Sequence, residues 1–155
     1  MMQPNIKYAV YLLEKRDYSR RDLINKISEK YTPEQAEEAA DYCERYHYID
    51  DERYALRLWE RYSENYGKQR ILKELYKRGI DRDLSRKVEE EMFDREQEEA
   101  KVLFLLRQKL KNRPIADKKE ENKVSAFLSR KGFSFEAINR AIREYNENEE
   151  RTDDE

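Results

Sequence analysis

The sequence predicts an all-α fold, an elongated, curved array of three tandem three-helix repeats. Apolar residues follow the i, i+3, i+4 spacing of a helix face along nearly all of the 155-residue chain. The pattern recurs three times at an almost constant period, which is a specific sign of a repeat protein. Only three glycines and three prolines interrupt it, too few for the turns of a β-sandwich or barrel. Because a repeat of about 40 residues rarely folds alone, neighbouring repeats must stack and share a core.

Each repeat contains three amphipathic helices in the same order. The apolar triplets of the first helices begin 46 and then 45 residues apart and comprise Ala9, Leu12 and Leu13; Ala55, Leu58 and Trp59; and Ala100, Leu103 and Phe104. The second helices carry Leu23, Ile24 and Ile27; Ile71, Leu72 and Leu75; and Val124, Phe127 and Leu128. The third helices carry Ala36, Ala39 and Ala40; Leu84 and Val88; and Ile138, Ala141 and Ile142. We therefore place the repeats at residues 1–49, 50–93 and 94–145, followed by an acidic, disordered tail at 146–155.

Turn residues separate these helices. Thr32 and Gln35 are spaced as a capping box at the start of a third helix. The other N-cap candidates are Ser19, Asp81 and Ser134. Gly79 and Gly132 each follow a second helix, where a left-handed glycine would end it. Gly67 precedes the second helix of repeat two, and we expect its backbone freedom to allow a sharp reversal there.

The composition excludes several kinds of chemistry. The single cysteine, Cys43, and the single histidine, His47, cannot complete a zinc site or a Cys-His-Asn triad, so we interpret them as a core and a turn residue. No GxxxxGK[ST] loop is present for nucleotide hydrolysis. No apolar run approaches the ~18 residues of a membrane span, and no signal peptide opens the chain. One cysteine fits a reducing cytoplasm. We therefore expect a cytoplasmic protein that is not an enzyme and that has no metal, no cofactor and no membrane contact.

The formal net charge of −2 conceals a strong segregation of charge along the chain. Residues 32–66 hold ten acids against four arginines, and residues 146–155 hold six acids against one arginine. Residues 67–88 hold eight bases against three acids, and residues 101–131 hold ten against three. This pattern favours docking onto nucleic acid or a protein–nucleic acid assembly, although such charges can equally form a solvated helix face.

The basic helices are the strongest candidates for a functional surface. Arg70, Lys73 and Lys77 lie opposite the apolar positions Ile71 and Leu75, on a face that suits phosphates or an acidic protein groove. The predicted partner or nucleic-acid contacts are Lys68, Arg70, Lys73, Lys77, Arg78, Lys109, Lys111, Arg113, Lys118, Lys119, Lys123, Arg130 and Lys131.

Acids and tyrosines supply weaker candidates. Asp50 and Asp51 precede the helix of Ala55, where carboxylates cap free N–H groups, and a partner contact would be an additional role. Of the twelve tyrosines, Tyr66 and Tyr76 are flanked by bases and are candidates for a partner contact. The tyrosines that we interpret as packing residues are Tyr8, Tyr11, Tyr42, Tyr54 and Tyr62.

The segment YIDDERYALRLWERYSENYGKQRILKELYKRGI, from Tyr48 to Ile80, closely resembles the central signature of the RecX family of recombination regulators. The matching positions are Tyr48, Ile49, Asp50, Asp51, Tyr54, Ala55, Gly67, Arg70, Ile71, Glu74, Leu75, Arg78, Gly79 and Ile80. Repeat one adds Ala9, Leu12, Leu13, Arg16, Ser19 and Leu23, and repeat three adds Lys123, Leu128, Arg130, Lys131, Gly132 and Phe133. His47 and Tyr31 depart from the family pattern, because each stands where the family usually has a turn glycine.

This resemblance implies a non-enzymatic inhibitor of the RecA recombinase. A family member would bind the RecA–DNA filament along its groove and suppress filament assembly, ATP hydrolysis and strand exchange. Under this hypothesis the rod bridges successive filament subunits. Its basic faces in repeats two and three would meet acidic protein surface or DNA phosphates, and the acidic stretch 32–66 would meet basic loops.

Two other functions stay open at this point. The chain could be a stand-alone nucleic-acid-binding module of helix-turn-helix-like repeats, or a scaffold for an unrelated protein. The sequence does not decide whether single- or double-stranded DNA is contacted directly, and a monomer is the oligomeric state that we expect.

Overall fold

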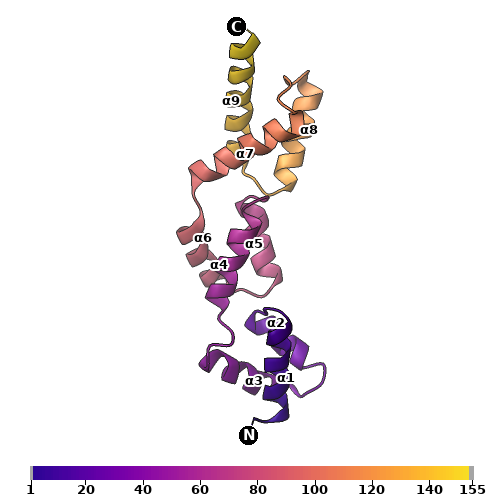
Figure 1. The fold of residues 1–155 in the computed structure, drawn as a ribbon, viewed down its shortest axis with the longest axis vertical. Coiled ribbons are helices and arrows are strands. Elements are labelled where there is room, and N and C mark those ends of the chain that lie inside the picture. The colour runs from indigo at the N-terminus through magenta and orange to yellow at the C-terminus, as the bar shows by residue number, and fades with distance from the viewer. Residues whose placement is uncertain (1, 154–155) are drawn as a thin grey trace. The chain divides into compact units, whose positions relative to one another are not determined.

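The computed structural model describes residues 2–153 and the side chains of residues 2–148. Within these residues the chain forms nine α-helices and no β-strand, which confirms the predicted all-α class (Figure 1). The helices are α1 (Pro4–Lys15), α2 (Arg20–Ile27), α3 (Pro33–Arg45), α4 (Asp51–Tyr62), α5 (Lys68–Lys77), α6 (Arg82–Met92), α7 (Arg95–Leu110), α8 (Lys118–Arg130) and α9 (Phe135–Asp153). They form three groups of three, and we call α1–α3, α4–α6 and α7–α9 repeats one, two and three.

Four helices, α2, α3, α6 and α9, begin at the N-cap residues that the sequence predicted. Thr32 and Gln35 form a reciprocal capping box at α3, and the Ser19 hydroxyl accepts from the backbone N–H of Asp22 at 3.2 Å. Asp81 and Ser134 cap α6 and α9 in the same way, by accepting from Leu84 N at 2.8 Å and Ala137 N at 3.1 Å. These bonds satisfy N–H groups that have no partner within their own helix.

Within the described residues, left-handed residues follow four of the helices: His47 after α3, Gly79 after α5, Lys111 and Asn112 after α7, and Gly132 after α8. Gly79 and Gly132 have φ of 82° and 94°, which confirms the predicted conformation at both positions. His47 has φ of 63°, so it adopts without a glycine the conformation for which the family pattern usually supplies one. Tyr31 has no positive φ, and the turn after α2 therefore differs from those after α5 and α8.

The chain divides into two compact units that cut across the repeats. The first unit comprises the described residues of Met1–Trp59 and Glu74–Glu90, and the second those of Glu60–Lys73 and Glu91–Glu155. Helices α4, α5 and α6 therefore contribute residues to both units. The predicted repeat boundaries at residues 49, 93 and 145 stay a prediction.

The core of the first unit lies where α1, α2 and α3 pack against one another. Ala9, Leu23 and Ala36, which come from these three helices, are fully buried, as the helical spacing predicted. The buried members of this core are Ile6, Ala9, Leu12, Leu23, Ile27, Ala36, Ala39, Cys43 and Ile49.

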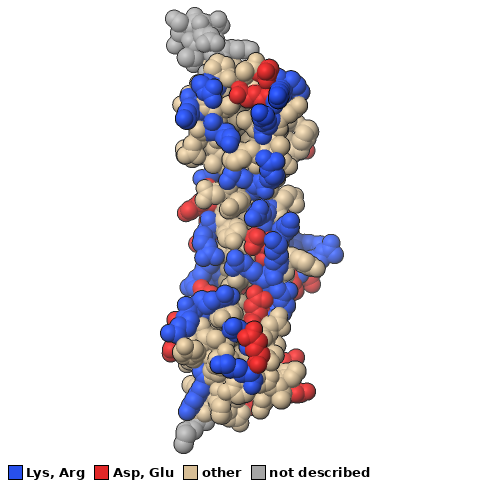
Figure 2. All heavy atoms as spheres, turned by 90° about the vertical axis from the view of Figure 1, so that its right-hand side faces the viewer, with Lys and Arg blue, Asp and Glu red and all other residues tan. Residues whose placement is uncertain are grey.

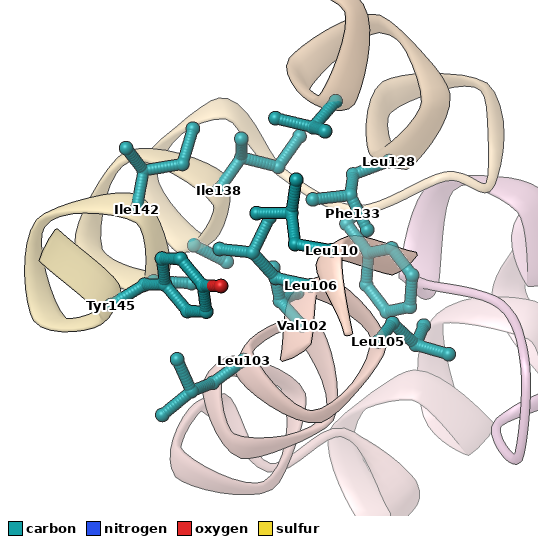
Figure 3. Close-up of a cluster of buried hydrophobic side chains, with 13 residues drawn as sticks. Val102, Leu103, Leu105, Leu106, Leu110, Leu128, Phe133, Ile138, Ile142 and Tyr145 are labelled. Atoms are coloured by element: carbon teal, nitrogen blue, oxygen red, sulfur yellow. The ribbon is translucent and has the colours of Figure 1, made fainter. Parts of the chain in front are cut away.

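The core of the second unit is formed mainly by α7 and α9, with α8 packed beside them (Figure 3). Figure 3 shows Leu106 of α7 near Ile138 of α9, with Phe133 and Leu128 at the α8 side of the cluster. The buried members are Val102, Leu103, Leu105, Leu106, Leu110, Val124, Leu128, Phe133, Ala137, Ile138, Ala141, Ile142 and Tyr145.

The sequence pattern assigned the buried face of α7 incorrectly. Ala100 and Phe104 were expected in the core, but both are exposed, and Phe104 has 56% of its surface accessible. Val102, Leu106 and Leu110 are buried in their place. The cause is the continuous apolar run from residue 102 to residue 106, in which periodicity alone cannot identify the inner face.

Helix α9 continues beyond the last core residue. Tyr145 is almost fully buried, and its hydroxyl donates to the carbonyl oxygen of Arg113. The helix then runs on to Asp153, so most of the expected acidic tail is helical in this structure, while residues 154–155 lie outside the described residues. Glutamate is a strong helix former, which allows the helix to extend past its packed part.

Candidate partner and nucleic-acid interface

Three cations and two aromatic rings alternate on the second unit. The Nζ atom of Lys109 lies 4.4 Å from the ring centroid of Phe127. The Nζ atom of Lys131 lies 5.2 Å from the Phe127 centroid and 5.1 Å from that of Tyr66. The guanidinium carbon of Arg70 lies 5.1 Å from the Tyr66 centroid. All four distances are within the range of cation–π attraction, and we call these five residues the cation–aromatic strip.

The strip depends on close contact between two turns. The backbone N–H of Gly67 donates to the carbonyl oxygen of Lys131 at 2.9 Å, and that of Gln69 donates to Gly132 at 3.1 Å. A Cβ atom on Gly67 would lie 2.5 Å from the Gly132 carbonyl oxygen. Glycine is therefore required at position 67 for the approach of another backbone. The predicted reason, freedom for a sharp reversal, was wrong, because Gly67 has no positive φ.

An acidic side chain from repeat three completes this contact. The Glu98 carboxylate accepts from the backbone N–H of Lys68 at 3.3 Å and from that of Ser134 at 3.4 Å. The Glu98 carboxylate therefore caps the start of α5 and also binds the turn before α9, which links these two segments. A Cβ atom on Gly132 would overlap the backbone N and Cβ of Arg70. We call residues 67–70, with Glu98 and residues 131–134, the second joint.

A matching contact exists in the first unit. The Ser19 hydroxyl donates to the carbonyl oxygen of Arg78, and the Arg21 guanidinium donates to that of Lys77. A Cβ atom on Gly79 would lie 2.7 Å from the Cβ of Arg21. Residues 19–21, with Asp51 and residues 77–79, form the first joint.

Asp51 has the role in the first joint that Glu98 has in the second. Its carboxylate accepts from the backbone N–H of Arg20 at 2.8 Å, so it caps α2 of the preceding repeat. Burial raises the pKa of the Asp51 carboxyl, and the hydrogen bond from Arg20 offsets part of this rise. Asp50 instead caps its own helix by accepting from Arg53 N at 3.1 Å.

Three of the predicted basic contacts are held within the joints or beside them. Lys68 places its Nζ atom 4.6 Å from the ring centroid of Phe93. Arg78 donates to the Tyr54 hydroxyl at 2.9 Å and lies 3.7 Å from a Glu74 carboxylate oxygen. Lys77 lies 3.8 Å from the other Glu74 oxygen. These contacts give Lys68 and Arg78 structural roles that the sequence did not indicate.

Most of the other predicted contacts are exposed on their helices or loops. Lys118 lies 3.5 Å from Glu121. The remaining exposed side chains are Lys73, Lys111, Arg113, Lys119, Lys123 and Arg130. Figure 2 shows that Lys and Arg cover more of the face in view than Asp and Glu do, with acids interspersed. The charge blocks of the sequence are therefore partly mixed on the surface. Among the predicted bases, Arg70, Lys109 and Lys131 are brought together in the strip.

Sequence reasoning missed several members of these sites. Phe127 packs against the core of the second unit, as its helical spacing predicted, but its ring also lies between two lysines, which the sequence did not indicate. Glu98 and Arg20 had no assigned role. The spacing of Asp51 and Glu98, each in the first turn or two of a first helix, was an available signal, but their partners lie far away in the sequence.

The side chains that could bind a metal ion or act as a nucleophile are poorly placed for either role in the described residues. Within the described residues no three His, Cys, Asp or Glu side chains are grouped as a metal ion would require. The Cys43 thiol is buried, and this burial raises its pKa to about 11, which disfavours the nucleophilic thiolate. None of the described helices is both long and apolar enough to cross a membrane.

Comparison with known proteins relates this fold to one family. A family model described as RecX, third three-helix domain, matches residues 96–142. The regulatory protein RecX of Caldanaerobacter subterraneus subsp. tengcongensis is 30% identical over 137 residues, covering 87% of this chain and 67% of the relative. That of Actinobacillus pleuropneumoniae serotype 5b is 32% identical over 134 residues, or 83% of each chain.

Two solved structures share the fold. The crystal structure of RecX from Lactobacillus salivarius has a TM-score of 0.80 at 23% identity, covering 92% of this chain and 94% of the other. A second crystal structure, of a regulatory protein RecX, has a TM-score of 0.76 at 20% identity, covering 88% of this chain and 70% of the other. With relatives matched over most of both sequences and the same helical fold, the chain belongs to the RecX family of regulatory proteins.

Proposed function

We propose that this chain is a cytoplasmic, non-enzymatic regulator of the RecA recombinase. It binds the RecA–DNA filament and suppresses filament assembly, ATP hydrolysis and strand exchange. The observation that carries the proposal is membership of the RecX family over most of the chain, with relatives named as regulatory proteins. The grouping of basic residues in the second unit supports it physically.

The cation–aromatic strip is the proposed filament contact in the second unit. Lys109, Lys131 and Arg70 supply three positive charges, and their ring partners give the surface apolar area that strengthens a contact once water is excluded. Such a surface fits DNA phosphates or an acidic face of the recombinase. Exposed charges are screened by salt, so the interaction should weaken as ionic strength rises.

The test is the ATP turnover of RecA on single-stranded DNA with increasing amounts of this protein. We expect the wild-type chain to slow turnover at substoichiometric ratios. The double variant Lys109→Glu/Lys131→Glu should require about tenfold more protein for the same inhibition, because it places negative charge at the contact.

The matched control is Arg82→Glu/Arg86→Glu. It makes the same change in net charge at two exposed positions of α6, outside the strip. It should inhibit like the wild type, and circular dichroism should show equal helix content for all proteins. An unchanged ATP turnover with wild-type protein and a cognate recombinase would contradict the proposal.

The alternation of rings and cations also favours a second candidate, a nucleic-acid-binding module that acts without RecA. This function requires tight binding to bare DNA and a steep dependence on salt, with a slope of about −0.9 per phosphate contacted on duplex DNA. A salt titration of DNA binding without recombinase separates the two functions.

A further inference from the structure

Three tyrosine rings form a cluster on the first unit, at a distance in sequence from the cation–aromatic strip. The rings of Tyr8 and Tyr11, both on α1, are stacked with centroids 6.5 Å apart and an interplanar angle of 18°. The ring of Tyr31, from the turn after α2, lies 5.9 Å from that of Tyr8. We call these three residues the N-terminal tyrosine cluster.

Packing accounts for only part of this cluster. Tyr8 and Tyr31 are half-buried against the core of the first unit. Tyr11 has 53% of its surface exposed and is absent from that core, so the interpretation of Tyr11 as a packing residue was wrong. A large exposed ring beside two others offers area for a planar ligand.

Lysines surround the rings. The Nζ atom of Lys15 lies 5.2 Å from the Tyr11 centroid, and that of Lys30 lies 4.7 Å from the Tyr8 centroid. Lys7 is exposed one helical turn before Tyr11. All three lysines are solvent-exposed, and Lys15 and Lys30 can each turn from its ring to a phosphate without disturbing the fold.

A second tyrosine cluster in the same unit shows what the lysines contribute. Tyr42 lies 4.6 Å from Tyr46 and 6.4 Å from Tyr48, measured between ring centroids. Helix α3, which carries Tyr42 and has Tyr46 as its C-cap, also carries Asp41 and Glu44, which lie 2.6 Å and 3.2 Å from Arg20. Rings with acidic neighbours repel a polyanion, whereas rings with lysine neighbours attract one.

We propose that the N-terminal tyrosine cluster is a binding platform for single-stranded nucleic acid. An unpaired base stacks on the Tyr11 ring, and Lys7, Lys15 and Lys30 contact the flanking phosphates. Duplex DNA does not fit, because its bases are already stacked on each other. This platform is separate from the cation–aromatic strip and does not depend on the proposed action on RecA.

The test uses the full-length chain and a fluorescein-labelled oligothymidylate, with no recombinase present. Fluorescence anisotropy at low salt should give a dissociation constant about fivefold higher for Tyr11→Ala than for wild type. Tyr11→Phe keeps the ring and should bind like the wild type. Tyr46→Ala is the matched control, because Tyr46 is a paired tyrosine with a similar exposure of 56%. It should also bind like the wild type.

A second measurement separates stacking from charge. On an abasic oligonucleotide of the same length, wild type and Tyr11→Ala should bind equally, while Lys15→Glu/Lys30→Glu should weaken binding to both oligonucleotides. Equal affinity of wild type and Tyr11→Ala for oligothymidylate would overturn the proposal. The proposal would also be overturned, in favour of an acidic protein partner, if Tyr11→Ala weakened binding to the abasic strand as much as binding to oligothymidylate. Competition by polyglutamate as strong as that by unlabelled oligothymidylate would overturn it in the same way. Repeating the titration in the Lys109→Glu/Lys131→Glu background removes any contribution of the strip.

Discussion

The first and second joints have the same plan but different chemistry. In the first joint, the start of α2 packs against the turn at Gly79 that follows α5. In the second joint, the start of α5 packs against the turn at Gly132 that follows α8. In both, a carboxylate from the first helix of the next repeat caps the incoming helix, Asp51 in one joint and Glu98 in the other. The first joint is made by side chains, from Ser19 and Arg21, whereas the second is made by backbone amides of Gly67 and Gln69.

This difference shows how one packing requirement can be met by two sets of residues. A side-chain joint needs glycine on one side only, at Gly79, because the serine and arginine can adjust their positions. A backbone joint needs glycine on both sides, at Gly67 and Gly132, because neither main chain can move away. We therefore expect the second joint to be less tolerant of substitution.

The largest expected effect is that of Gly132→Ala. The new Cβ would overlap the backbone of Arg70, and alanine would also have to adopt a φ near 94°. Backbone strain and overpacking together should lower the free energy of unfolding by about 3–4 kcal/mol, measured by urea denaturation. Gly79→Ala has a similar φ of 82°, but the three atoms nearest its new Cβ all belong to the Arg21 side chain, so it should cost about 1–2 kcal/mol. Equal losses for the two variants would contradict the distinction between the joints.

A smaller effect is expected from Ser19→Ala in the first joint. This fully buried hydroxyl caps α2 and also donates to the Arg78 carbonyl, so its loss should cost about 2 kcal/mol. Thr32→Ala is the matched control, because Thr32 caps α3 within its own repeat and its side chain is exposed. It should cost about 1 kcal/mol in the same denaturation experiment. If the two losses are equal, the Ser19 hydroxyl contributes only as a cap.

The features predicted well from the sequence are those set by local chemistry. The capping box at Thr32 and the left-handed glycines at positions 79 and 132 depend on neighbours within a few residues. The features missed depend on contacts between repeats. Gly67 was interpreted as a flexible turn residue, whereas the structure requires it for the approach of the Gly132 backbone. Asp51 was expected to cap its own helix, but Asp50 does this and Asp51 caps α2.

The candidate site was predicted by residue type but not by arrangement. Arg70, Lys109 and Lys131 stood among thirteen basic candidates with no sign that they would meet. They meet because the turn at Lys131 is hydrogen-bonded to Gly67, which brings Tyr66 beside it. A pairing of backbones that are distant in sequence leaves no local pattern, and the strip was therefore not predictable from periodicity or charge.

The smallest expected effect concerns pH and the carboxylate of the first joint. Burial raises the pKa of Asp51 above its usual 3.8, so the folded state holds this proton more tightly than the unfolded state does. Above both pKa values the ionised carboxyl disfavours folding relative to the protonated form. The contribution of Asp51 to the free energy of unfolding therefore falls as pH rises from about 3.8 through the raised folded pKa. Asp51→Asn keeps an oxygen that can accept from Arg20 and removes the titration.

Urea denaturation of wild type and Asp51→Asn across this acidic range measures the effect. The stability of the wild type relative to the variant should decline with pH by about 1 kcal/mol or less, because Asp51 is only half-buried, and should then stay constant. Asp50→Asn, at an exposed cap of the same helix, is the control for the loss of a carboxylate. A relative stability that rises with pH would show that the hydrogen bond from Arg20 outweighs burial. The negative charge of Asp51 would then stabilise the first joint, and the contribution of Asp51 to the free energy of unfolding would be largest when its carboxyl is ionised.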